Sequence, residues 1–294
     1  MKLENNLVQR KFIVGDKWIY YKIYCGAKTS DYMLTEVIKP IIKNLIENNI
    51  ISKWFFIRYS DPSHHIRVRL YLNDSENIGR IINIFTQNVK IFVEEELIHK
   101  IEIDTYNREI ERYGSRTIEL SEKIFFHESN MVVNFLSLHP NDELRFLFAL
   151  KSIDTHLNGC HYSLEEKAIL FNQLKISFRN EFDKKNILTK DLSNKFRFLR
   201  NNIESFLDED VKHQELKKIL DEKNKNVESL LLNILKLRKS NNLEIHIDNL
   251  NSSYIHMLMN RMFKSKNRIY EMIGYDFLSR YYESKIAKAK YSNK

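Results

Sequence analysis

Two arginines separated by a single residue are the first candidates for chemistry in this sequence. Arg67 and Arg69 lie in the segment HIRVRLYL, residues 65–72, in which apolar and polar residues alternate. Successive side chains of a strand point to opposite faces, so both guanidinium groups are expected on one sheet face, with Cα atoms roughly 7 Å apart. A guanidinium donates two parallel hydrogen bonds to a carboxylate. The pair therefore indicates a carboxylate-binding face, although pairing with acidic residues of the helical half would explain it equally well.

A second arginine pair follows in the segment TYNREIERYG, residues 105–114. Arg108 and Arg112 are one helical turn apart, with Glu109 and Glu111 beside them, so local salt bridges could account for the pattern. Sequence alone does not place this pair relative to the first. Arg108 would lie close to Arg69 if the loops fold over the sheet face.

The segment SSYIHMLMNRMF, residues 252–263, predicts a helix that carries a histidine. Its apolar residues share one helical face: Ile255, Leu258, Met259 and Met262. Ser253, His256 and Asn260 form a polar stripe outside that face. An imidazole there could transfer protons near neutral pH, although a lone histidine on a helix is more often a hydrogen-bonded structural residue.

The remaining histidines and the two cysteines do not form a metal site or a disulfide framework in the sequence. Two histidine pairs lack partners at ligand spacing and are interpreted as structural or surface residues: His64–His65 and His156 with His161. Cys25 and Cys160 lie far apart, which argues against a disulfide framework. Such sparse cysteine usage is typical of proteins in a reducing cytoplasm. Nucleotide and flavin motifs are also lacking. We therefore expect no metal and no cofactor.

The composition describes a basic globular chain. Over 294 residues, 47 Lys and Arg face 39 Asp and Glu, which gives a net charge of +8. Nucleic acid, an anionic membrane or an acidic substrate would suit that charge, but its even spread is explained more simply by a solvated surface. No stretch approaches the roughly 18 apolar residues of a membrane span, and the N-terminus carries no secretion signal. We expect a soluble cytoplasmic protein.

The periodicity of the first 115 residues predicts an α+β fold. Strands are expected at residues 17–25, 53–59, 65–72 and 100–106, with helices beginning at Asp31 and near residue 73. The order βαββαβ is that of a ferredoxin-like antiparallel sheet, with two helices on one face. In the strand order 4-1-3-2 of such a sheet, the fourth strand is an edge and the HIRVR strand is interior.

From residue 116 onward the sequence predicts a mostly α-helical half. Ser163 and Glu166 form a capping-box pattern at the start of one helix, and Asn226 is expected to cap another. We thus expect an α+β part, residues 1–115, and a helical part, residues 116–294, packed together as one catalytic unit.

Four segments together resemble one known family. They are WIYYKIYCG at 18–26, KWFFIRYSDPSHHIRVRL at 53–70, TYNREIERYG at 105–114, and residues 255–280, where IHMLMNR precedes Arg268 and Glu271. This set is similar to the lantibiotic-dehydratase C-terminal or thiopeptide-type bacteriocin biosynthesis family. The ordered recurrence of the segments along the whole chain makes coincidence a poor explanation.

The resemblance implies a lyase that eliminates glutamate from glutamylated Ser or Thr of a precursor peptide, leaving dehydroalanine or dehydrobutyrine. A carboxylate ester leaves as a stable anion, so the difficulty is to remove the α-proton and to stabilise the enolate. The resemblance implies Arg69 and Arg108 as carboxylate ligands, His256 as the proton-transfer group and Arg67 as a charge stabiliser. Further substrate contacts are expected from three residues: Arg112, Asn260 and Arg261.

The resemblance also implies partners and leaves alternatives open. A precursor peptide and a separate tRNA-dependent glutamylating subunit are expected, because the chain lacks a large glutamylating domain. A homodimer is compatible with the sequence. One alternative is a pyridine synthase that joins two dehydroalanines by a formal [4+2] cycloaddition; another is a non-catalytic subunit of a bacteriocin-modifying complex. Direct nucleic-acid binding is not expected, since HIRVRLYL has arginines where an RNA-binding sheet has aromatic residues.

Overall fold

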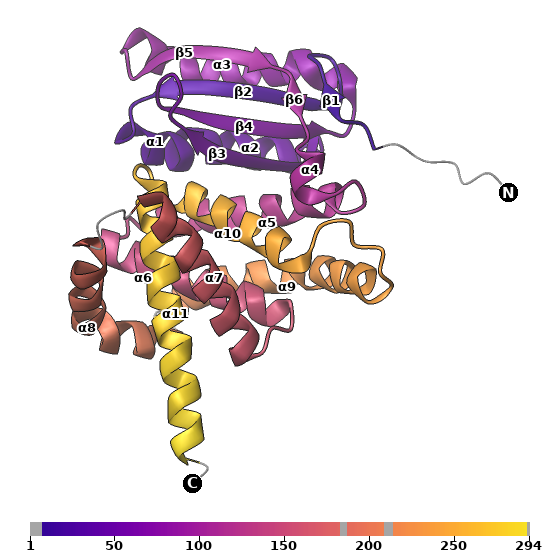
Figure 1. Ribbon diagram of the computed structural model, residues 1–294. Helices are drawn as coiled ribbons and strands as arrows, with labels where there is room; N and C mark the ends of the chain where they lie inside the picture. Colours follow the sequence, from indigo (N-terminus) through magenta and orange to yellow (C-terminus); the bar gives the residue numbers. More distant parts are fainter. Residues whose placement is uncertain (1–7, 183–186, 209–213, 293–294) are drawn as a thin grey trace, which may run out of the picture. The chain divides into compact units, whose positions relative to one another are not determined.

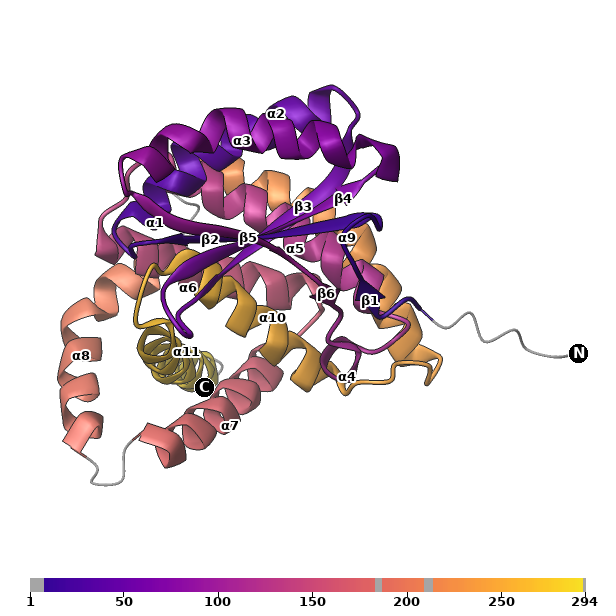
Figure 2. The same ribbon diagram turned by 90° about the horizontal axis from the view of Figure 1, so that it is seen from above.

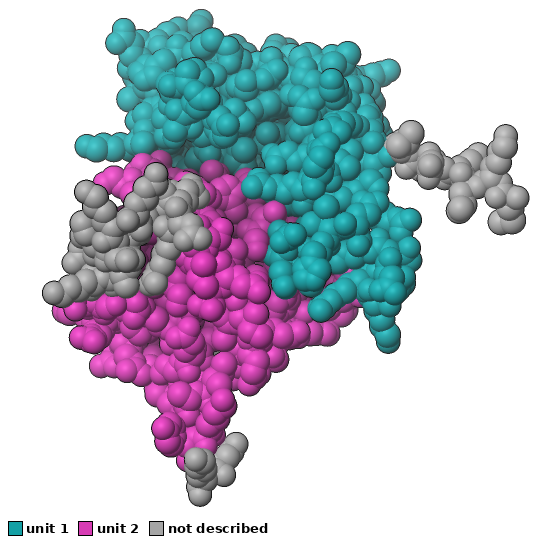
Figure 3. Space-filling view, viewed as in Figure 1, with its two compact units in different colours: residues 1–139, 236–250 teal, residues 140–235, 251–294 magenta. Residues whose placement is uncertain are grey.

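The computed structural model describes residues 8–182, 187–208 and 214–292. The chain divides into two compact units (Figure 3). The first unit comprises Met1–His139 and Lys236–Leu250, and the second comprises Pro140–Leu235 and Asn251–Lys294. The expected α+β class is confirmed, because an antiparallel sheet is followed by helices from α4 (Ile110–Tyr113) onward.

A four-stranded antiparallel sheet forms the core of the first unit. Its strands are β2 (Trp18–Cys25), β3 (Ile51–Tyr59), β4 (His65–Leu72) and β5 (Ile98–Asp104), in the order β3-β4-β2-β5. This is the strand order expected from the sequence, with the arginine-bearing strand in the interior. The alternating pattern of β4 decides which of its faces is covered, because one face is wholly apolar and must be kept from water.

Helices cover the apolar face of this sheet (Figure 2). The β4 side chains on that face are fully buried: Ile66, Val68, Leu70 and Leu72. The ring of Tyr21 stacks on that of Phe85 from α3, with centroids 4.3 Å apart. The covering elements are α1 (Thr29–Tyr32), the π-helix η1 (Met33–Ile38), α2 (Lys39–Glu47), the 3₁₀ turn η2 (Ser75–Asn77) and α3 (Ile78–Glu94).

Pro40 explains why the first expected helix is built in three pieces. A proline inside a helix lacks an N–H and clashes with the carbonyl one turn earlier. Here it lies in the first turn of α2, directly after η1. Pro40 has no backbone N–H to donate to a carbonyl of the preceding turn. Both the wider π turn before it and its place in the first turn of α2 are compatible with that missing hydrogen bond.

The opposite sheet face carries the arginines and is bordered by further elements of the first unit. A small two-stranded sheet joins β1 (Lys11–Phe12) to β6 (Tyr106–Asn107). Helix α5 (Ile118–Leu136) runs along the edge strand β3, where Trp54 Nε1 donates to Asn130 Oδ1 at 2.8 Å. The Phe56 N–H donates to Ser129 Oγ at 3.3 Å. Helix side chains thus satisfy polar groups along this edge.

Glu244 ties residues 236–250 to the first unit. Its carboxylate accepts hydrogen bonds from the backbone N–H and, at 2.6 Å, from the hydroxyl of Ser115. The neighbouring Gly114 has a φ of 77°, and a Cβ there would lie 2.9 Å from Glu244 Oε2. The positive φ therefore favours glycine at this turn.

Long helices form the second unit, and two of these helices also contribute residues to the first unit (Figure 1). The capping box is confirmed, since the Ser163 N–H donates to Glu166 Oε2 at 2.8 Å and the Glu166 N–H to Ser163 Oγ at 3.1 Å. The expected cap at Asn226 is wrong: α9 begins at Gln214 and passes through it, because buried residues continue the helical spacing from Leu216 to Ile234. The helices are α6 (Asp142–Gly159), α7 (Leu164–Phe182), α8 (Ile187–Asp208), α9 (Gln214–Lys239), α10 (Ile247–Met262) and α11 (Asn267–Ser292).

None of the helices in the described ranges is long and apolar enough to cross a membrane.

Candidate functional site

Arg69 lies within a group of aromatic rings on the polar face of the sheet. Its guanidinium carbon is 4.4 Å from the ring centroid of Tyr20, 4.9 Å from that of Tyr106 and 5.2 Å from that of Phe55. Tyr20 and Phe55 are its partners in the sheet register. The side chain is buried, and its Nε has no hydrogen-bond partner. Aromatic stacking holds the guanidinium plane while leaving donor capacity unused.

Arg67 is held by a tyrosine ring and a neutral histidine. Its guanidinium carbon is 3.6 Å from the Tyr59 centroid, and its Nε donates to His65 Nε2 at 3.0 Å. His65 Nδ1 lies 2.8 Å from the Ser63 carbonyl oxygen, so Nδ1 carries the ring proton. Burial lowers the pKa of His65 against the effect of the Ser63 hydrogen bond, and the Arg67 charge lowers it further. His65 thus stays neutral and acts as an acceptor for Arg67.

We call the surface around these two arginines the arginine face; it comprises Tyr20, Phe55, His65, Arg67 and Arg69. In the described part of the chain, neither arginine forms an ion pair with a carboxylate. Lys22, opposite Arg67 in the register, differs because it pairs with Asp104 at 2.5 Å. The Lys22 hydrogen bond is the main cause that lowers the pKa of Asp104. The arginine face therefore holds two guanidinium charges that suit an added anion.

Arg108 is engaged in a buried ion pair next to the arginine face. Its Nε and Nη2 donate to Glu122 Oε1 and Oε2 at 2.7 and 2.8 Å. Glu122 is 0% exposed and Arg108 is 3% exposed. The same carboxylate accepts from Lys53 Nζ at 3.0 Å and from the Tyr106 hydroxyl at 3.1 Å. Because the Tyr106 ring also packs on Arg69, the structure brings Arg69 and Arg108 to the same tyrosine.

Burial is the largest cause that raises the pKa of Tyr106 well above its usual range, and the Glu122 charge adds to it. Tyr106 is therefore a neutral donor to Glu122. Glu122 was not singled out in the sequence, since its carboxylate lies 14 positions after Arg108 in another element. A glutamate at the first turns of a helix is too common to serve as a signal.

Arg112 forms a local ion pair at the short helix α4. Its Nη1 lies 3.2 Å from Glu109 Oε2, and both side chains are exposed. This is the local salt bridge that the spacing allowed. The expected substrate contact of Arg112 stays a prediction.

In the second unit, His256 is oriented by a buried glutamate. His256 Nδ1 lies 2.9 Å from Glu271 Oε2, and the Tyr275 hydroxyl donates to Glu271 Oε1 at 2.6 Å. Arg268 Nη1 adds a longer contact of 3.4 Å to Oε2. A carboxylate accepts hydrogen bonds, so Nδ1 carries the proton and Nε2 is the basic nitrogen. The His256 side chain is 25% exposed, which leaves the imidazole accessible.

The other two residues expected from α10 are Asn260 and Arg261. Arg261 is fully buried. Asn260 uses its backbone carbonyl to accept from Asn267 Nδ2 at 3.0 Å. The predicted apolar face of the helix is confirmed by the burial of four residues: Ile255, Leu258, Met259 and Met262. The substrate contacts of Asn260 and Arg261 stay predictions.

The structure thus gathers three expected residues, Arg67, Arg69 and Arg108, in the first unit. His256 belongs to the second unit, where its partner is Glu271. Across the described residues, no group of three or more His, Cys, Asp or Glu side chains is placed to hold a metal ion.

His156 is a structural residue, in keeping with the interpretation from sequence. It is buried, and its Nε2 lies 3.0 Å from Asn251 Oδ1. Burial, with a smaller effect of the Lys223 charge, lowers the pKa of His156 to about 3. The folded protein therefore holds this imidazole neutral at neutral pH.

This burial predicts a loss of stability in mild acid. An unfolded histidine takes up a proton near pH 6.5, whereas folded His156 does not, so the unfolded state gains stability as pH falls from 6.5 towards 3. We expect the unfolding free energy of the wild type to drop by about 2 kcal/mol more than that of His156→Gln between pH 7 and pH 5. Urea titrations at both pH values measure this. Equal pH dependence of the two proteins would contradict it.

A ferredoxin-like antiparallel sheet whose polar face carries Arg67 and Arg69, followed by helices, defines the class as α+β. The model of the family described as the lantibiotic biosynthesis dehydratase C-terminal domain matches residues 18–282. The chain belongs to this family of bacteriocin biosynthesis proteins, as the resemblance in its sequence implied.

Individual relatives agree with the family. Nisin biosynthesis protein NisB of Lactococcus lactis subsp. lactis is 33% identical over 132 residues, which cover 44% of this chain and 13% of that protein. The chain spans less than a fifth of the length of the curated relatives it matches.

Two solved structures share the fold. The tRNA-dependent lantibiotic dehydratase MibB from Microbispora sp. 107891 matches with a TM-score of 0.66 and 18% identity, over 91% of this chain and 28% of that chain. TbtD, a pyridine synthase from thiomuracin biosynthesis, matches with a TM-score of 0.63 and 11% identity, over 91% and 99%. At these identities the likeness concerns the fold.

Proposed function

We propose that this protein is a lyase that eliminates glutamate from glutamylated Ser or Thr side chains of a precursor peptide. The observation that carries the proposal is the arginine face, where Arg67 and Arg69 have no carboxylate partner among the described residues. A glutamyl group brings the carboxylate that such a pair binds. Family membership supplies the context of lantibiotic biosynthesis.

In the proposed reaction, a proton leaves the α-carbon of the modified Ser or Thr, and the C–O bond to the glutamyl ester breaks. The electrons of the C–H bond form the new C=C bond, and glutamate departs as a carboxylate. Arg69 binds the glutamyl carboxylate, and Arg67 stabilises negative charge as it develops. His256 Nε2 transfers the proton, with Glu271 fixing the tautomer of the ring.

For Arg108 the contacts support a different role from the one implied by the resemblance. Its fork is filled by Glu122, and removing a partner from a buried ion pair is costly. We propose that Arg108 positions Tyr106 beside Arg69 through Glu122. On this proposal, Arg108 does not hold the glutamyl carboxylate directly.

The proposed partners are a precursor peptide and a dehydratase domain that attaches glutamate to it. We also propose a cytoplasmic location, where ribosomal peptides are made. Both cysteines, Cys25 and Cys160, are free and buried, which suits a reducing compartment.

The His256 assignment predicts a large loss of activity. His256→Ala should lower the rate of elimination by about 10²-fold or more, as general-base removal does elsewhere. Glu271→Gln should lower it less, because the amide can still contact the ring but no longer favours a proton on Nδ1. The rates are measured with a glutamylated peptide under single-turnover conditions. Full activity of His256→Ala would remove it from the mechanism.

The test of the function itself uses a synthetic precursor peptide that bears a glutamyl ester on one Ser. We expect the wild type to convert it to dehydroalanine, seen by mass spectrometry as loss of the glutamate adduct. A second peptide carrying two dehydroalanines tests cycloaddition. Cyclisation of the second peptide with the ester left intact would replace the lyase proposal with a pyridine synthase.

A further inference from the structure

The outer edge of β5 is unpaired. β5 is the last strand in the order β3-β4-β2-β5, and β2 is its partner on the inner side. In the part of the chain that the structure describes, no other strand pairs with it. An edge strand presents free N–H and C=O groups that form a template for another strand.

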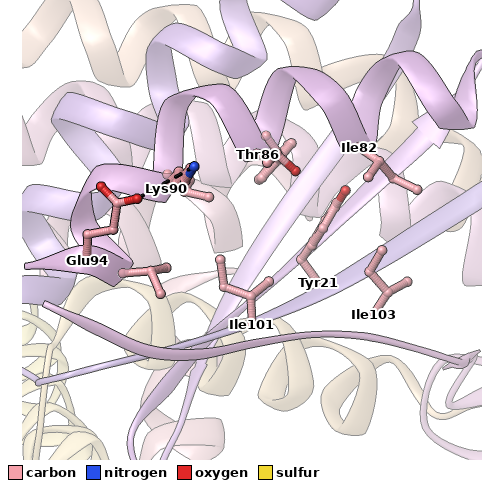
Figure 4. A pocket seen from close by; sticks show the side chains of 10 residues that line it. Tyr21, Ile82, Thr86, Lys90, Glu94, Ile101 and Ile103 are labelled. Carbon is pink, nitrogen blue, oxygen red and sulfur yellow. Dashed lines mark ion pairs between the residues drawn. The ribbon is translucent and has the colours of Figure 1, made fainter. Parts of the chain in front are cut away.

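An apolar groove lies beside this edge, between β5 and α3 (Figure 4). It has a volume of about 400 Å³, and Ile82, Val89, Ile101 and Ile103 are among the residues that line it. Val93, which also lines the groove, is 42% exposed, and the nearby Leu97 is 38% exposed. An apolar groove next to a free strand edge is typical of an interaction surface.

We propose that β5 pairs with β5 of a second copy of this chain, which joins two four-stranded sheets into one of eight strands. The proposal concerns an interface and is independent of the lyase function. It rests on the charges that flank the centre of the strand. Lys100 and Glu102 stand on either side of Ile101, on the face away from the groove, where they pair within one chain.

The charges select one register for such a dimer. Directly opposed residues of antiparallel strands share a sheet face. A twofold axis perpendicular to the sheet must therefore lie midway between one residue and the same residue of the second copy, and we name the axis by that residue. With the axis at Ile101, Lys100 lies opposite Glu102 of the second copy, and this happens twice. With the axis at Lys100 or at Glu102, like charges oppose each other, which is destabilising. The strand is thus self-complementary about Ile101.

This register also covers the groove. A perpendicular axis keeps α3 of both copies on the same side of the extended sheet. The two Ile101 side chains then meet at the axis on the groove side, where Val93 of each copy also lines the groove. Apolar surface that each single chain leaves in contact with water would be buried.

The test measures self-association of the full chain by analytical ultracentrifugation. We expect the wild type to dimerise, and Lys100→Glu and Glu102→Lys each to weaken dimerisation at least tenfold, since either change makes both cross-strand pairs repulsive. The double variant K100E/E102K should restore it. A mixture of the two single variants should form heterodimers, because two glutamates then face two lysines.

The mixing experiment separates the interface from a folding defect, since a variant that failed to fold could not rescue the other. A wild type that stays monomeric at high micromolar concentration would overturn the proposal, as would an edge that captures only an extended peptide. Dimers that are insensitive to both single changes would place the contact elsewhere and overturn it too. Failure of the mixture to pair would exclude the Ile101 register.

Discussion

Arg69→Ala should lower the catalytic efficiency of glutamate elimination by about 10²- to 10³-fold, the effect of removing one preorganised donor to a reacting anion. The structure gives Arg69 three aromatic neighbours and no carboxylate partner in the described residues, so no protein carboxylate neutralises its charge. Arg69→Lys should recover only part of the rate, because an ammonium keeps the charge but lacks the planar fork. Conversion of a glutamyl-ester peptide, followed by mass spectrometry, gives the rates.

Arg80→Ala is the matched control for this experiment. Arg80 is exposed on α3 and is not part of the arginine face, so its loss should leave the rate unchanged. Circular dichroism checks that Arg69→Ala is folded. A folded Arg69→Ala protein with the wild-type rate would falsify the proposed role of the arginine face in binding the glutamyl group.

Breaking the Arg108–Glu122 pair should be the most destabilising single change near the site. Arg108→Ala or Glu122→Ala leaves a buried charge without its main partner, which typically costs about 3–5 kcal/mol. Glu122→Ala also removes the acceptor of Lys53 and Tyr106. The unfolding free energy in urea measures the loss. The variant R108M/E122L should lose less than the two single changes added together, because neither main charge is then left behind.

An exposed ion pair in the same region provides the comparison. Arg10 and Glu111 form a close contact, but both side chains are more than half exposed. Glu111→Ala should therefore cost less than about 1 kcal/mol. Additive losses in R108M/E122L, or a loss for Glu122→Ala as small as that for Glu111→Ala, would show that the buried pair does not hold this part of the molecule together.

Local pattern was sufficient to predict most of the sheet. The strand expected at residues 65–72 has those bounds, and the expected strand order is the observed one. Three strands were expected to begin at residues 17, 53 and 100 but begin at Trp18, Ile51 and Ile98. The last of them was also expected to run to residue 106, but it ends at Asp104, and Tyr106 begins β6. That break depends on pairing of β6 with β1, about a hundred residues earlier, and no local signal reports such a distant partner.

The sequence by itself determined that Arg67 and Arg69 share one face of an interior strand, because alternation along a strand is a property of the backbone. Only the tertiary structure decided which charges are already paired. Glu122 pairs with Arg108, and Glu271 orients His256. Neither of these carboxylates pairs with Arg67 or Arg69. Ion pairing depends on the distance between side chains of different elements, and spacing within one segment does not contain that distance.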